Sequence, residues 1–483
     1  MSHQPQAGTA PSHTGQKKSR AGKFLIRLTA IATLGGLLFG FDTGVISGAL
    51  LYMRQDLDLS SVQEALLVTA LLFPGATGGA LLGGPLSDRI GRKLTLVACA
   101  AVFIAGTLGC AFAPDFGTLV FARIVLGAAV GCASVTCPVY LAEMAPADRR
   151  GRMVTINQLM IVVGLFLSFS TNVLLDQLIH DPRAWRFMLG IAAVPAAALF
   201  LGMFWLPDSP RWYALKGRFE QCRQTLLLGR DAATADHEYG QIVETVKIDA
   251  QESRGLGAEL RILRAHPWMR RILLIGVVFA IAQQTTGVNV VTYYTPTVLA
   301  NSGLTNSASL LASVTVGITL IVGTLIGIWL LGFMPRRRMV LIGFGAVAVS
   351  HVCLALTFAL PESTVRSYLI LVFLLCVDSS MTTFLGTSSW LILSEISPTR
   401  IRGFAMGASL AALWMANAAI SFLFPIVVGA IGPIPTFAIF IVFNVVAFVF
   451  CARYIPETKD RTLEEVEEQL RSAEPARSVK QTV

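Results

Sequence analysis

Apolar runs alternate with short polar turns along most of the chain, from about residue 24 to about residue 456. We count twelve such runs, and each has about 20 residues, the length that an α-helix needs to cross the hydrocarbon core of a bilayer. Two polar stretches break the alternation, one at 207–269 between the sixth and seventh runs and one after 456. The pattern predicts an all-α membrane protein with twelve transmembrane helices.

A repeated motif divides this series in two. LAEMAPADRRGR at 141–152 returns as LSEISPTRIRGF at 393–404. Four positions match at one offset of 395 − 143 = 252, about half the chain: Glu143, Pro146, Arg150 and Gly151 align with Glu395, Pro398, Arg402 and Gly403. A weaker echo joins LPDSPR to IPETKD, with 456 − 207 = 249. The duplication predicts two pseudo-symmetric six-helix bundles, an architecture that places a substrate site between the halves.

The predicted organisation has five segments. They are a disordered cytoplasmic N-terminal tail at 1–22, an N-terminal six-helix bundle at 23–206, cytoplasmic linker helices at 207–269, a C-terminal six-helix bundle at 270–456 and a cytoplasmic C-terminal tail at 457–483.

Composition supports a membrane location, because 54% hydrophobic and only 14% charged residues fit no soluble globular protein. The net charge of 38 − 29 = +9 comes from Lys and Arg in alternate loops, which is the positive-inside pattern rather than a surface for nucleic acid. The basic loops include Lys17, Lys18, Lys23 and Arg27, then Arg89, Arg92 and Lys93, then Arg149, Arg150 and Arg152, then Arg336 to Arg338, and Arg400 and Arg402. Both termini are therefore predicted to be cytoplasmic in a bacterial cell membrane, with no cleavable signal peptide.

The polar stretch at 207–269 contains no nucleotide-binding loop and no catalytic constellation. We therefore expect neither an enzyme nor a pump driven by nucleotide hydrolysis. Seven of the 8 cysteines lie within apolar runs, and their spacing indicates neither a metal site nor a disulfide framework. The expected partners are a small-molecule substrate, protons and membrane lipids, with no cofactor or metal and with the chain as a monomer.

Two charged residues lie inside apolar runs, Asp42 in the first and Arg123 in the fourth. A charge within a membrane helix is rare and marks function by default. At a rise of ~1.5 Å per residue, Asp42 and Arg123 lie about 6 and 9 Å below the outer boundary, so their depths allow them to meet. Such a pair either lets Asp42 release a proton when Arg123 approaches or is a permanent structural ion pair. Both interpretations stay open at this stage.

Glycines at four-residue spacing mark another face of the first run, at Gly36, Gly40, Gly44 and Gly48. The second run repeats the spacing at Gly75, Gly79 and Gly83. A ridge without side chains allows a neighbouring helix to approach closely. Asp42 faces away from the first ridge, and Phe39 shares its side at helical spacing, so we interpret that side as lining a cavity.

The seventh run is unusually polar, with Gln283, Gln284, Asn289, Tyr293 and Tyr294 in one apolar span. These groups are costly in a membrane unless they face a polar ligand or cavity. Amides both donate and accept hydrogen bonds, which suits a ligand with many hydroxyls. Hydrogen bonding between helices is the alternative explanation. Gly287 and Pro296 predict a helix that bends or breaks, as binding helices of transporters often do.

Further candidates are a glutamine in the fifth run and small, aromatic and amide residues in the tenth and eleventh: Gln158, Gly386, Trp390, Trp414 and Asn417. A tryptophan at midspan offers a flat apolar face to a ring with axial hydrogens, and Gly386 leaves room for it. Single tryptophans are more often plain packing, so this interpretation has a simpler alternative. Asp88 lies in a short basic turn, where it can pair with a neighbouring arginine or be a solvated charge.

With these residues in view, the chain resembles the sugar porter family of the major facilitator superfamily over nearly its whole length. The matching motifs are GPLSDRIGRK, AEMAPADRRGR, PDSPRW, QQTTGVN, SEISPTRIRG and PETKDRTLEE. Within that family the chain looks most similar to bacterial myo-inositol and sugar proton symporters. The resemblance implies the major facilitator fold, with twelve helices, cytoplasmic linker helices and alternating access.

The resemblance also implies roles for individual residues. It makes Asp42 the proton-binding carboxylate and Arg123 its partner. It implies that the substrate contacts Phe39, Gln158, Gln283, Gln284, Asn289, Gly386, Trp390 and Asn417, to which the residues alone add Tyr293 and Trp414. It implies a charge network on the inner face that holds the outward-open state, formed by Asp88, Arg89, Arg92, Glu143, Arg150, Glu395 and Arg402.

Four departures from the family pattern stand out. Leu165 and Leu413 replace glutamines that many members have, so fewer hydrogen bonds await a sugar. LGFMPRRR in the second half lacks the acid and the glycine of the first-half turn, which predicts a lopsided network. Asp378 lies about midspan in the tenth run, at a depth similar to that of His351 in the ninth. We expect a structural contact between Asp378 and His351, with a second proton site as the less favoured alternative.

Together these observations predict a secondary transporter that imports a sugar or cyclitol with protons. A passive facilitator would keep the site without coupling, and Asp42 argues against it. An exporter of a less hydroxylated small molecule would fit the two leucines but not the amide-rich seventh run. A sugar sensor would normally carry a longer cytoplasmic extension than 457–483.

Overall fold

The computed structural model describes residues 13–179, 181–251, 256–398, 401–459, 465 and 468, without the side chains of 13–20, 247–251, 256–260, 402 and 403. In this part of the chain, 12 helices are long and apolar enough to cross a membrane, and the residues form helices and turns without strands. The predicted all-α fold with twelve membrane helices is therefore confirmed.

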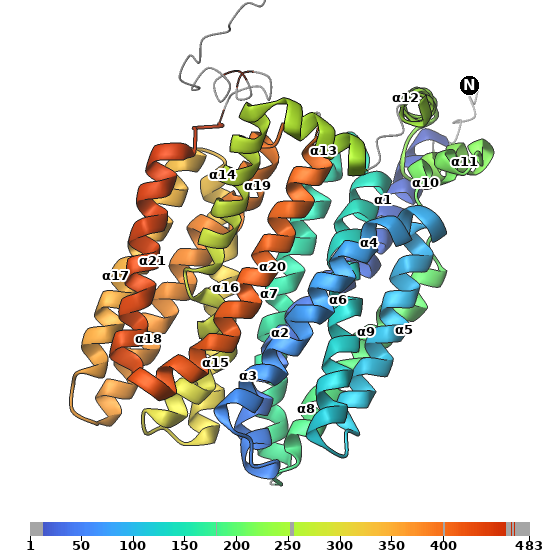
Figure 1. Cartoon of the computed structure of the whole chain (residues 1–483). Coiled ribbons are helices and arrows are strands. Elements are labelled where there is room, and N and C mark those ends of the chain that lie inside the picture. The colour runs from blue at the N-terminus through green and yellow to red at the C-terminus, as the bar shows by residue number, and fades with distance from the viewer. Residues whose placement is uncertain are drawn as a thin grey trace, which may run out of the picture.

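The first six membrane helices form one bundle (Figure 1). Its elements are α1 (His13–Ala32) and α2 (Leu34–Asp56), α3 (Ser61–Ala70), the π-helical turn η1 (Leu71–Ala76) and α4 (Thr77–Ile90), α5 (Arg92–Ala111), α6 (Phe116–Met144), α7 (Ala147–Leu178), and α8 (Ala184–Gly190) with α9 (Ala193–Phe204). Helix α1 begins within the segment 1–22 that the sequence predicts to be a tail, and residues 1–12 lie outside the described residues.

The last six membrane helices form the second bundle beside the first (Figure 1). Its elements are α14 (Pro267–Gln284) and α15 (Val288–Asn301), α16 (Asn306–Leu331), α17 (Arg336–Phe358), α18 (Thr364–Ser380) with the π-helical turn η2 (Met381–Gly386) and α19 (Thr387–Ile396), α20 (Arg402–Ile431) and α21 (Pro433–Tyr454).

Four helices connect the bundles: α10 (Pro210–Leu215), α11 (Phe219–Gly229), α12 (Ala232–Gln251) and α13 (Leu256–Ala265). They lie at one end of the molecule, which we call the linker end, and the opposite end is the far end (Figure 1). The predicted C-terminal tail falls largely on residues outside the described part of the chain.

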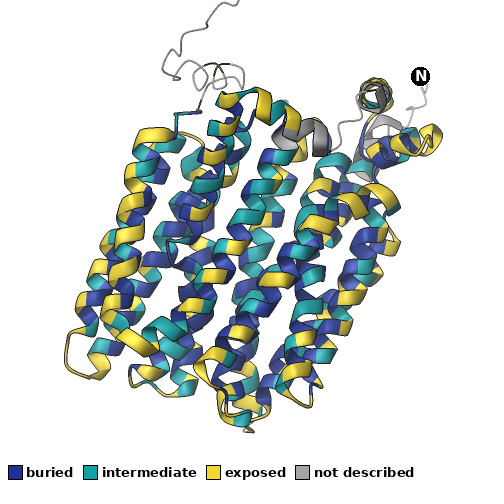
Figure 2. Ribbon diagram, viewed as in Figure 1, coloured by how far each residue is buried: buried dark blue, intermediate teal, exposed yellow. Residues whose placement is uncertain are grey.

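Exposed residues recur along the helices of both bundles (Figure 2). Many of them are large and apolar, including Leu82, Phe121, Val194, Trp329 and Val446. A soluble protein rarely exposes apolar surface on this scale. These faces suit contact with lipid chains, and the polar groups described below lie inside.

Glycines bring the helices of the first half into close contact, as the four-residue spacing predicts. A Cβ atom added at Gly40 on α2 would lie 1.8 Å from the carbonyl oxygen of Ile161 on α7. At Gly79 on α4, the added atom would lie 2.1 Å from the carbonyl oxygen of Ala128 on α6. Backbone meets backbone at both contacts, so no larger residue fits.

The seventh membrane helix breaks where the sequence predicts. Gly287 separates α14 from α15 and has φ +82°, a conformation that favours glycine. Pro296 lies within α15 without ending it. The break gives Gln283 and Gln284 a different helix axis from Asn289 and Tyr293.

The two halves touch toward the far end. There, α15 packs on α2, α3 on α20, and α16 on α7. The contact of α16 with α7 is close, because a Cβ atom added at Gly317 would lie 2.8 Å from the Cα atom of Phe166. At the linker end, α14 and α19 pack mainly against helices of their own half.

Candidate functional site

A buried ion pair joins the first and fourth membrane helices. Nη1 of Arg123 on α6 lies 2.9 Å from Oδ1 of Asp42 on α2, and each residue is 1% exposed. Arg123 also donates from Nε to the carbonyl oxygen of Leu67, at 3.3 Å. Oδ2 of Asp42 has no hydrogen-bond partner among the described residues. The predicted meeting of Asp42 and Arg123 is thus present, and one carboxyl oxygen has no partner among the described residues.

The polar residues at the break of the seventh membrane helix are mostly buried. Asn289 donates a hydrogen bond from its amide to the side-chain oxygen of Gln284, across the break at Gly287. Gln283 is buried, and its side-chain oxygen has no partner within the described residues. Two of the three amides are therefore bonded to each other, and the third, Gln283, has a buried acceptor without a partner among the described residues.

Contacts between the halves run through the candidate substrate residues. Tyr293 on α15 lies near Thr43 on α2 and Asn417 on α20, and close to the Asp42–Arg123 pair. The ring of Phe39 on α2 meets the ring of Trp414 on α20 edge to face, with centroids 5.5 Å apart. The residues predicted to bind the substrate thus also join the two halves beside the ion pair.

Three other predicted substrate residues are more open. Gln158 on α7 is exposed, Trp390 on α19 is 38% exposed, and Gly386 ends η2 with intermediate burial. Trp414 is buried, and its Nε1 donor has no partner in the part of the chain that the structure describes. Buried polar atoms usually have partners, so this donor and the Gln283 acceptor are places where a hydroxylated ligand could bind.

The sequence did not single out Asn157, which neighbours Gln158. Asn157 is buried, its side chain lies against Gly36, and its Oδ1 accepts a hydrogen bond from the Cys137 thiol at 3.2 Å. Adjacent residues on a helix point about 100° apart. Two neighbouring amides on α7 therefore have different environments, one packed against α2 and one exposed.

At the linker end of the first half, Arg92 is the centre of the charge network. Its Nη2 lies 2.8 Å from Oδ1 of Asp88, and its Nε lies 3.0 Å from Oε2 of Glu143 on α6. Its backbone N–H donates to Oδ1 of Asp208, at 2.9 Å. Asp208, just after α9, thus caps the start of α5, where backbone donors lack helical partners.

The second half repeats this arrangement. Nη2 of Arg336, at the start of α17, lies 3.2 Å from Oε1 of Glu395 on α19. Glu457, just after α21, accepts backbone hydrogen bonds from Arg336 at 3.0 Å and Arg337 at 3.1 Å. The sequence placed Arg336 in a basic loop, but it assigned Arg336, Asp208 and Glu457 no part in the charge network, although the LPDSPR and IPETKD echo contained the two acids.

The remaining predicted network residues are placed differently. Arg89 is exposed, and Arg150 donates from Nε to the carbonyl oxygen of Ala142 at 3.0 Å. The side chain of Arg402 lies outside the described residues. The pairs Arg92–Glu143 and Arg336–Glu395 each join two helices of the same half, so the predicted role in holding the outward-open state stays a prediction.

The expected contact between Asp378 and His351 is wrong as a hydrogen bond. Both side chains are 0% exposed, but neither Asp378 oxygen nor Nε2 of His351 has a hydrogen-bond partner among the described residues. Instead, Nδ1 of His351 bonds to the carbonyl oxygen of Val347 at 2.9 Å, and the ring lies beside Phe437 and Phe440. Equal depth does not fix the direction in which each helix presents its side chain.

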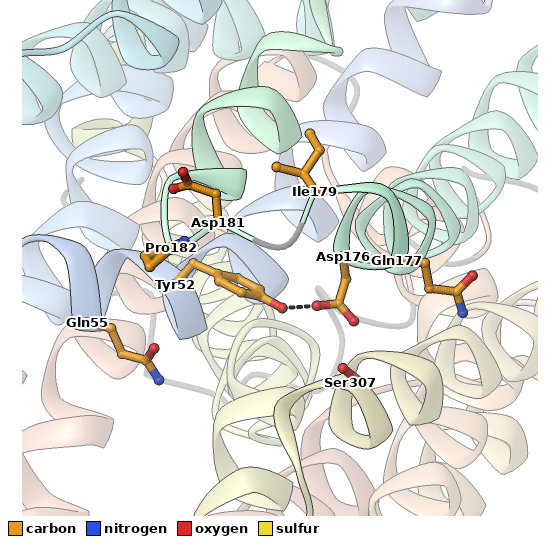
Figure 3. A pocket seen from close by; sticks show the side chains of 8 residues that line it. All are labelled: Tyr52, Gln55, Asp176, Gln177, Ile179, Asp181, Pro182 and Ser307. Carbon is orange, nitrogen blue, oxygen red and sulfur yellow. Dashed lines mark hydrogen bonds between the residues drawn. The ribbon is translucent and has the colours of Figure 1, made fainter.

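A separate polar pocket of about 350 Å³ lies at the far end, outside the candidate site. Its walls come from the ends of α2 and α7, the turn before α8 and the start of α16 (Figure 3). Tyr52 donates a hydrogen bond to Asp176 across it, and Ser307 faces the same opening. The pocket thus lies on the boundary between the halves.

Comparisons with known proteins agree with the geometry. A family model described as "Sugar (and other) transporter" matches residues 28–470. Among curated relatives, the putative metabolite transport protein YfiG of Bacillus subtilis is 42% identical over 460 residues, with 94% of each chain covered. The major myo-inositol transporter IolT of the same organism is 41% identical over 460 residues, covering 94% of this chain and 96% of its own.

A more distant relative and a solved structure extend the comparison. The D-xylose transporter of Levilactobacillus brevis is 37% identical, covering 91% of this chain and 94% of its own. The inward-open conformation of the xylose transporter XylE from E. coli matches with a TM-score of 0.77 and 28% identity, over 92% of this chain and 99% of that one. The similarity therefore spans both bundles.

Proposed function

The chain belongs to the sugar transporter family, and on that premise we propose that it imports a monosaccharide or cyclitol together with protons by alternating access. The observation that carries this proposal is the buried ion pair of Asp42 and Arg123, whose Oδ1 and Nη1 atoms are 2.9 Å apart. The pair lies beside the residues that join the two halves. A membrane-embedded carboxyl with one free oxygen is a suitable proton carrier.

The proposed substrate is a small ring with several hydroxyl groups. The free acceptor of Gln283 and the free donor of Trp414 would bind hydroxyls, and the exposed face of Trp390 would pack against the ring. Relatives named as transporters of myo-inositol, glucose and D-xylose support this class. Leu165 and Leu413, both buried, provide no hydrogen bonds, which favours a ligand with fewer contacts on those sides.

In the proposed cycle, protonation of Asp42 weakens its bond to Arg123, and substrate then binds between the halves. Thr43 follows Asp42 in the chain and lies near Tyr293, so a shift of Asp42 reaches the contact with the second half directly. The halves then rock about the site, substrate leaves on the other side, and Arg123 helps Asp42 to lose its proton. The linker end is cytoplasmic in this proposal, following the distribution of Lys and Arg.

The energy supply is sufficient for accumulation. One charge moving through ~100 mV provides roughly 2.3 kcal/mol, which corresponds to about fifty-fold accumulation before any pH gradient is added. A named galactose-proton symporter of Escherichia coli among the relatives, 34% identical over 468 residues, supports coupling of this kind.

The test is uptake into proteoliposomes with and without an imposed proton gradient. Labelled myo-inositol, glucose and xylose are each offered to the wild type, to Asp42→Asn and to the control Asp58→Asn. Asp58 is exposed at the far end with φ 46°, a conformation that asparagine also adopts, so this control removes an acid without strain. We expect gradient-driven accumulation in the wild type and control, and exchange without accumulation in Asp42→Asn.

Other results would change the proposal. Equilibration without accumulation in all three proteins would make the chain a passive facilitator and the Asp42–Arg123 pair structural. Failure to move any of the three substrates would reject a polyol ligand and point to a less hydroxylated molecule beside Leu165 and Leu413.

A further inference from the structure

We propose that Asp378 is a second proton-binding carboxyl, located in the second half, and that His351 accepts its hydrogen bond in another state of the transport cycle. This inference rests on the proposed proton coupling and deepens it. Asp378 lies on α18 in the tenth membrane helix, which spans Thr364–Ile396, so the carboxyl is near the middle of the membrane. It belongs to the opposite half from Asp42 and Arg123.

The environment of Asp378 requires a proton on the carboxyl in this state. The side chain is 0% exposed, and its two oxygens have no hydrogen-bond partner in the described part of the chain. An ionised carboxylate in an apolar interior without donors or a counter-charge is far less stable than the neutral acid. Asp42 differs in this respect, because Arg123 provides both a charge and a donor.

The helices packed on α18 contain few groups that could share that proton. They are α15, α16, α17 and η2. Their sequences place His351 and Cys353 on α17 and Tyr293 and Tyr294 on α15 within the membrane, and they place no titratable residue on α16 or η2. The arginines at the start of α17 lie at the linker end, and Arg366 of α18 pairs with Glu362 at the far end. His351 is therefore the basic side chain available at this depth.

The hydrogen bond of His351 shows which of its ring nitrogens carries the hydrogen. Nδ1 lies 2.9 Å from the carbonyl oxygen of Val347, and a carbonyl can only accept, so Nδ1 carries the hydrogen. In a neutral ring, Nε2 is then an acceptor. Nε2 is buried without a partner among the described residues. The protonated Asp378 carboxyl is a donor without an acceptor, so the two unpartnered groups are chemically complementary.

An irregular turn of helix lies next to Asp378. The π-helical turn η2 begins three residues later, at Met381, and α17 packs on both α18 and η2. Such turns are frequent at functional sites in helices. A change in bend at η2 would move Asp378 relative to His351, so that the acid O–H can donate to Nε2 in another state of the cycle. The proton then leaves to water as the carboxylic acid becomes a carboxylate, and no further reactant is needed.

Infrared spectroscopy of the purified transporter tests the proton directly. We expect a carbonyl stretching band of a protonated carboxylic acid that is lost in Asp378→Asn and kept in the control Asp58→Asn. His351→Phe keeps a ring against Phe437 and Phe440 but removes the acceptor. It should keep the band in the substrate-free protein and abolish the shift of this band that substrate causes in the wild type.

Transport provides the second measurement. The proton-to-substrate stoichiometry, obtained from the substrate gradient that balances a known proton gradient, should fall by one in Asp378→Asn. In the wild type in D₂O, the acid band should exchange its hydrogen for deuterium during turnover and not at rest, a readout that needs no variant.

Each contrary result has a distinct meaning. Acid bands that are the same in Asp378→Asn as in the wild type show that this group holds no proton and overturn the proposal. A band that is lost while the stoichiometry stays unchanged, or that does not exchange during turnover, makes the proton a permanent structural one and also overturns it. Absence of coupling in the wild type would instead reject the proposed function, and the band would still report on Asp378.

Discussion

Arg92 in the first half and Arg336 in the second occupy matching positions, at the start of the third helix of each bundle, with different surroundings. Both pair with a glutamate that ends another helix of the same half, and both have a backbone N–H capped by an acid after the last helix of the bundle. Arg92 also bonds to Asp88 and follows Gly91, whereas Pro335 precedes Arg336.

The comparison shows which interactions the two halves share and which the first half has in addition. The arginine, the glutamate and the capping acid are present in both halves, so they are what each bundle needs to join its helix ends. Asp88 and Gly91 belong to the first half alone. The Arg92 side chain is 6% exposed and that of Arg336 is 18% exposed, so the arginine of the first half is more buried.

The largest expected effect is the loss of Arg92. Arg92→Ala leaves the Glu143 carboxylate, 11% exposed, without its partner, and breaking such a pair costs about 3 kcal/mol. Arg336→Ala breaks the Arg336–Glu395 pair, which is more exposed to solvent, and it should therefore cost about 1 kcal/mol. Thermal unfolding of the two variants in detergent measures the difference. Equal losses would mean that the two halves rely equally on their arginines.

The second largest effect on stability is expected for a substitution of Gly91. It has φ +100° and ψ 155°, a region essentially restricted to glycine, and an added Cβ would lie 2.1 Å from Oδ2 of Asp208. Gly91→Ala should therefore destabilise the protein by about 2 kcal/mol through backbone strain and displacement of the cap. Pro335→Gly, at the matching place in the second half, should change the stability by less than about 1 kcal/mol. A mild Gly91→Ala would show that the turn before α5 can relax.

Asp208 offers a smaller, pH-dependent effect. Burial raises the pKa of the Asp208 carboxyl above its ordinary value of 3.8, although backbone N–H groups and Arg92 oppose the shift. A raised pKa means that folding gains most from this group below pH 3.8 and loses that gain as the pH rises through the folded-state pKa. Asp208→Asn keeps an oxygen for the cap and cannot ionise. Its unfolding free energy, relative to the wild type, should therefore improve as the pH rises from the acid range to neutrality.

The control for this experiment is Asp208→Ala, which removes the cap and should cost about 1 kcal/mol. If Asp208→Asn and the wild type keep a constant difference in stability from acid to neutral pH, then the carboxyl is not destabilised by its burial.

The smallest expected effect is that of Asp88. Its side chain is 64% exposed, and exposed ion pairs contribute between about 0 and 1 kcal/mol. Asp88→Asn should lower the stability slightly at low salt and have no effect at high salt. Unfolding of the variant and wild type at two salt concentrations measures this. A loss that persists at high salt would assign Asp88 a role beyond its charge.

The hydrophobic pattern alone predicted the twelve helices, and the repeat predicted two similar six-helix halves. Length and polarity are sufficient to predict the helices, because a bilayer tolerates little else. The Asp42–Arg123 pair was also predictable, since two charges at similar depth in apolar helices have few other partners.

Other features depend on information that the sequence does not carry. Asp208 and Glu457 cap backbone N–H groups. Almost every residue has such a group, so the sequence does not indicate which ones need a cap. Asn157 and Gln158 are adjacent amides, and only the rotation of α7 decides which of them faces α2. The same uncertainty misled the expectation for Asp378 and His351, which share a depth but form no hydrogen bond with each other.

Gly40 carries a mechanical consequence. Because a Cβ there would meet the Ile161 carbonyl at 1.8 Å, α2 and α7 cannot slide past each other without separating their backbones. The two helices therefore move as one rigid body, so that Asp42 and Gln158 move together whenever the first half rocks. Probes placed on α2 and α7 should keep a constant spacing throughout transport, while the gap from either probe to the second half opens and closes.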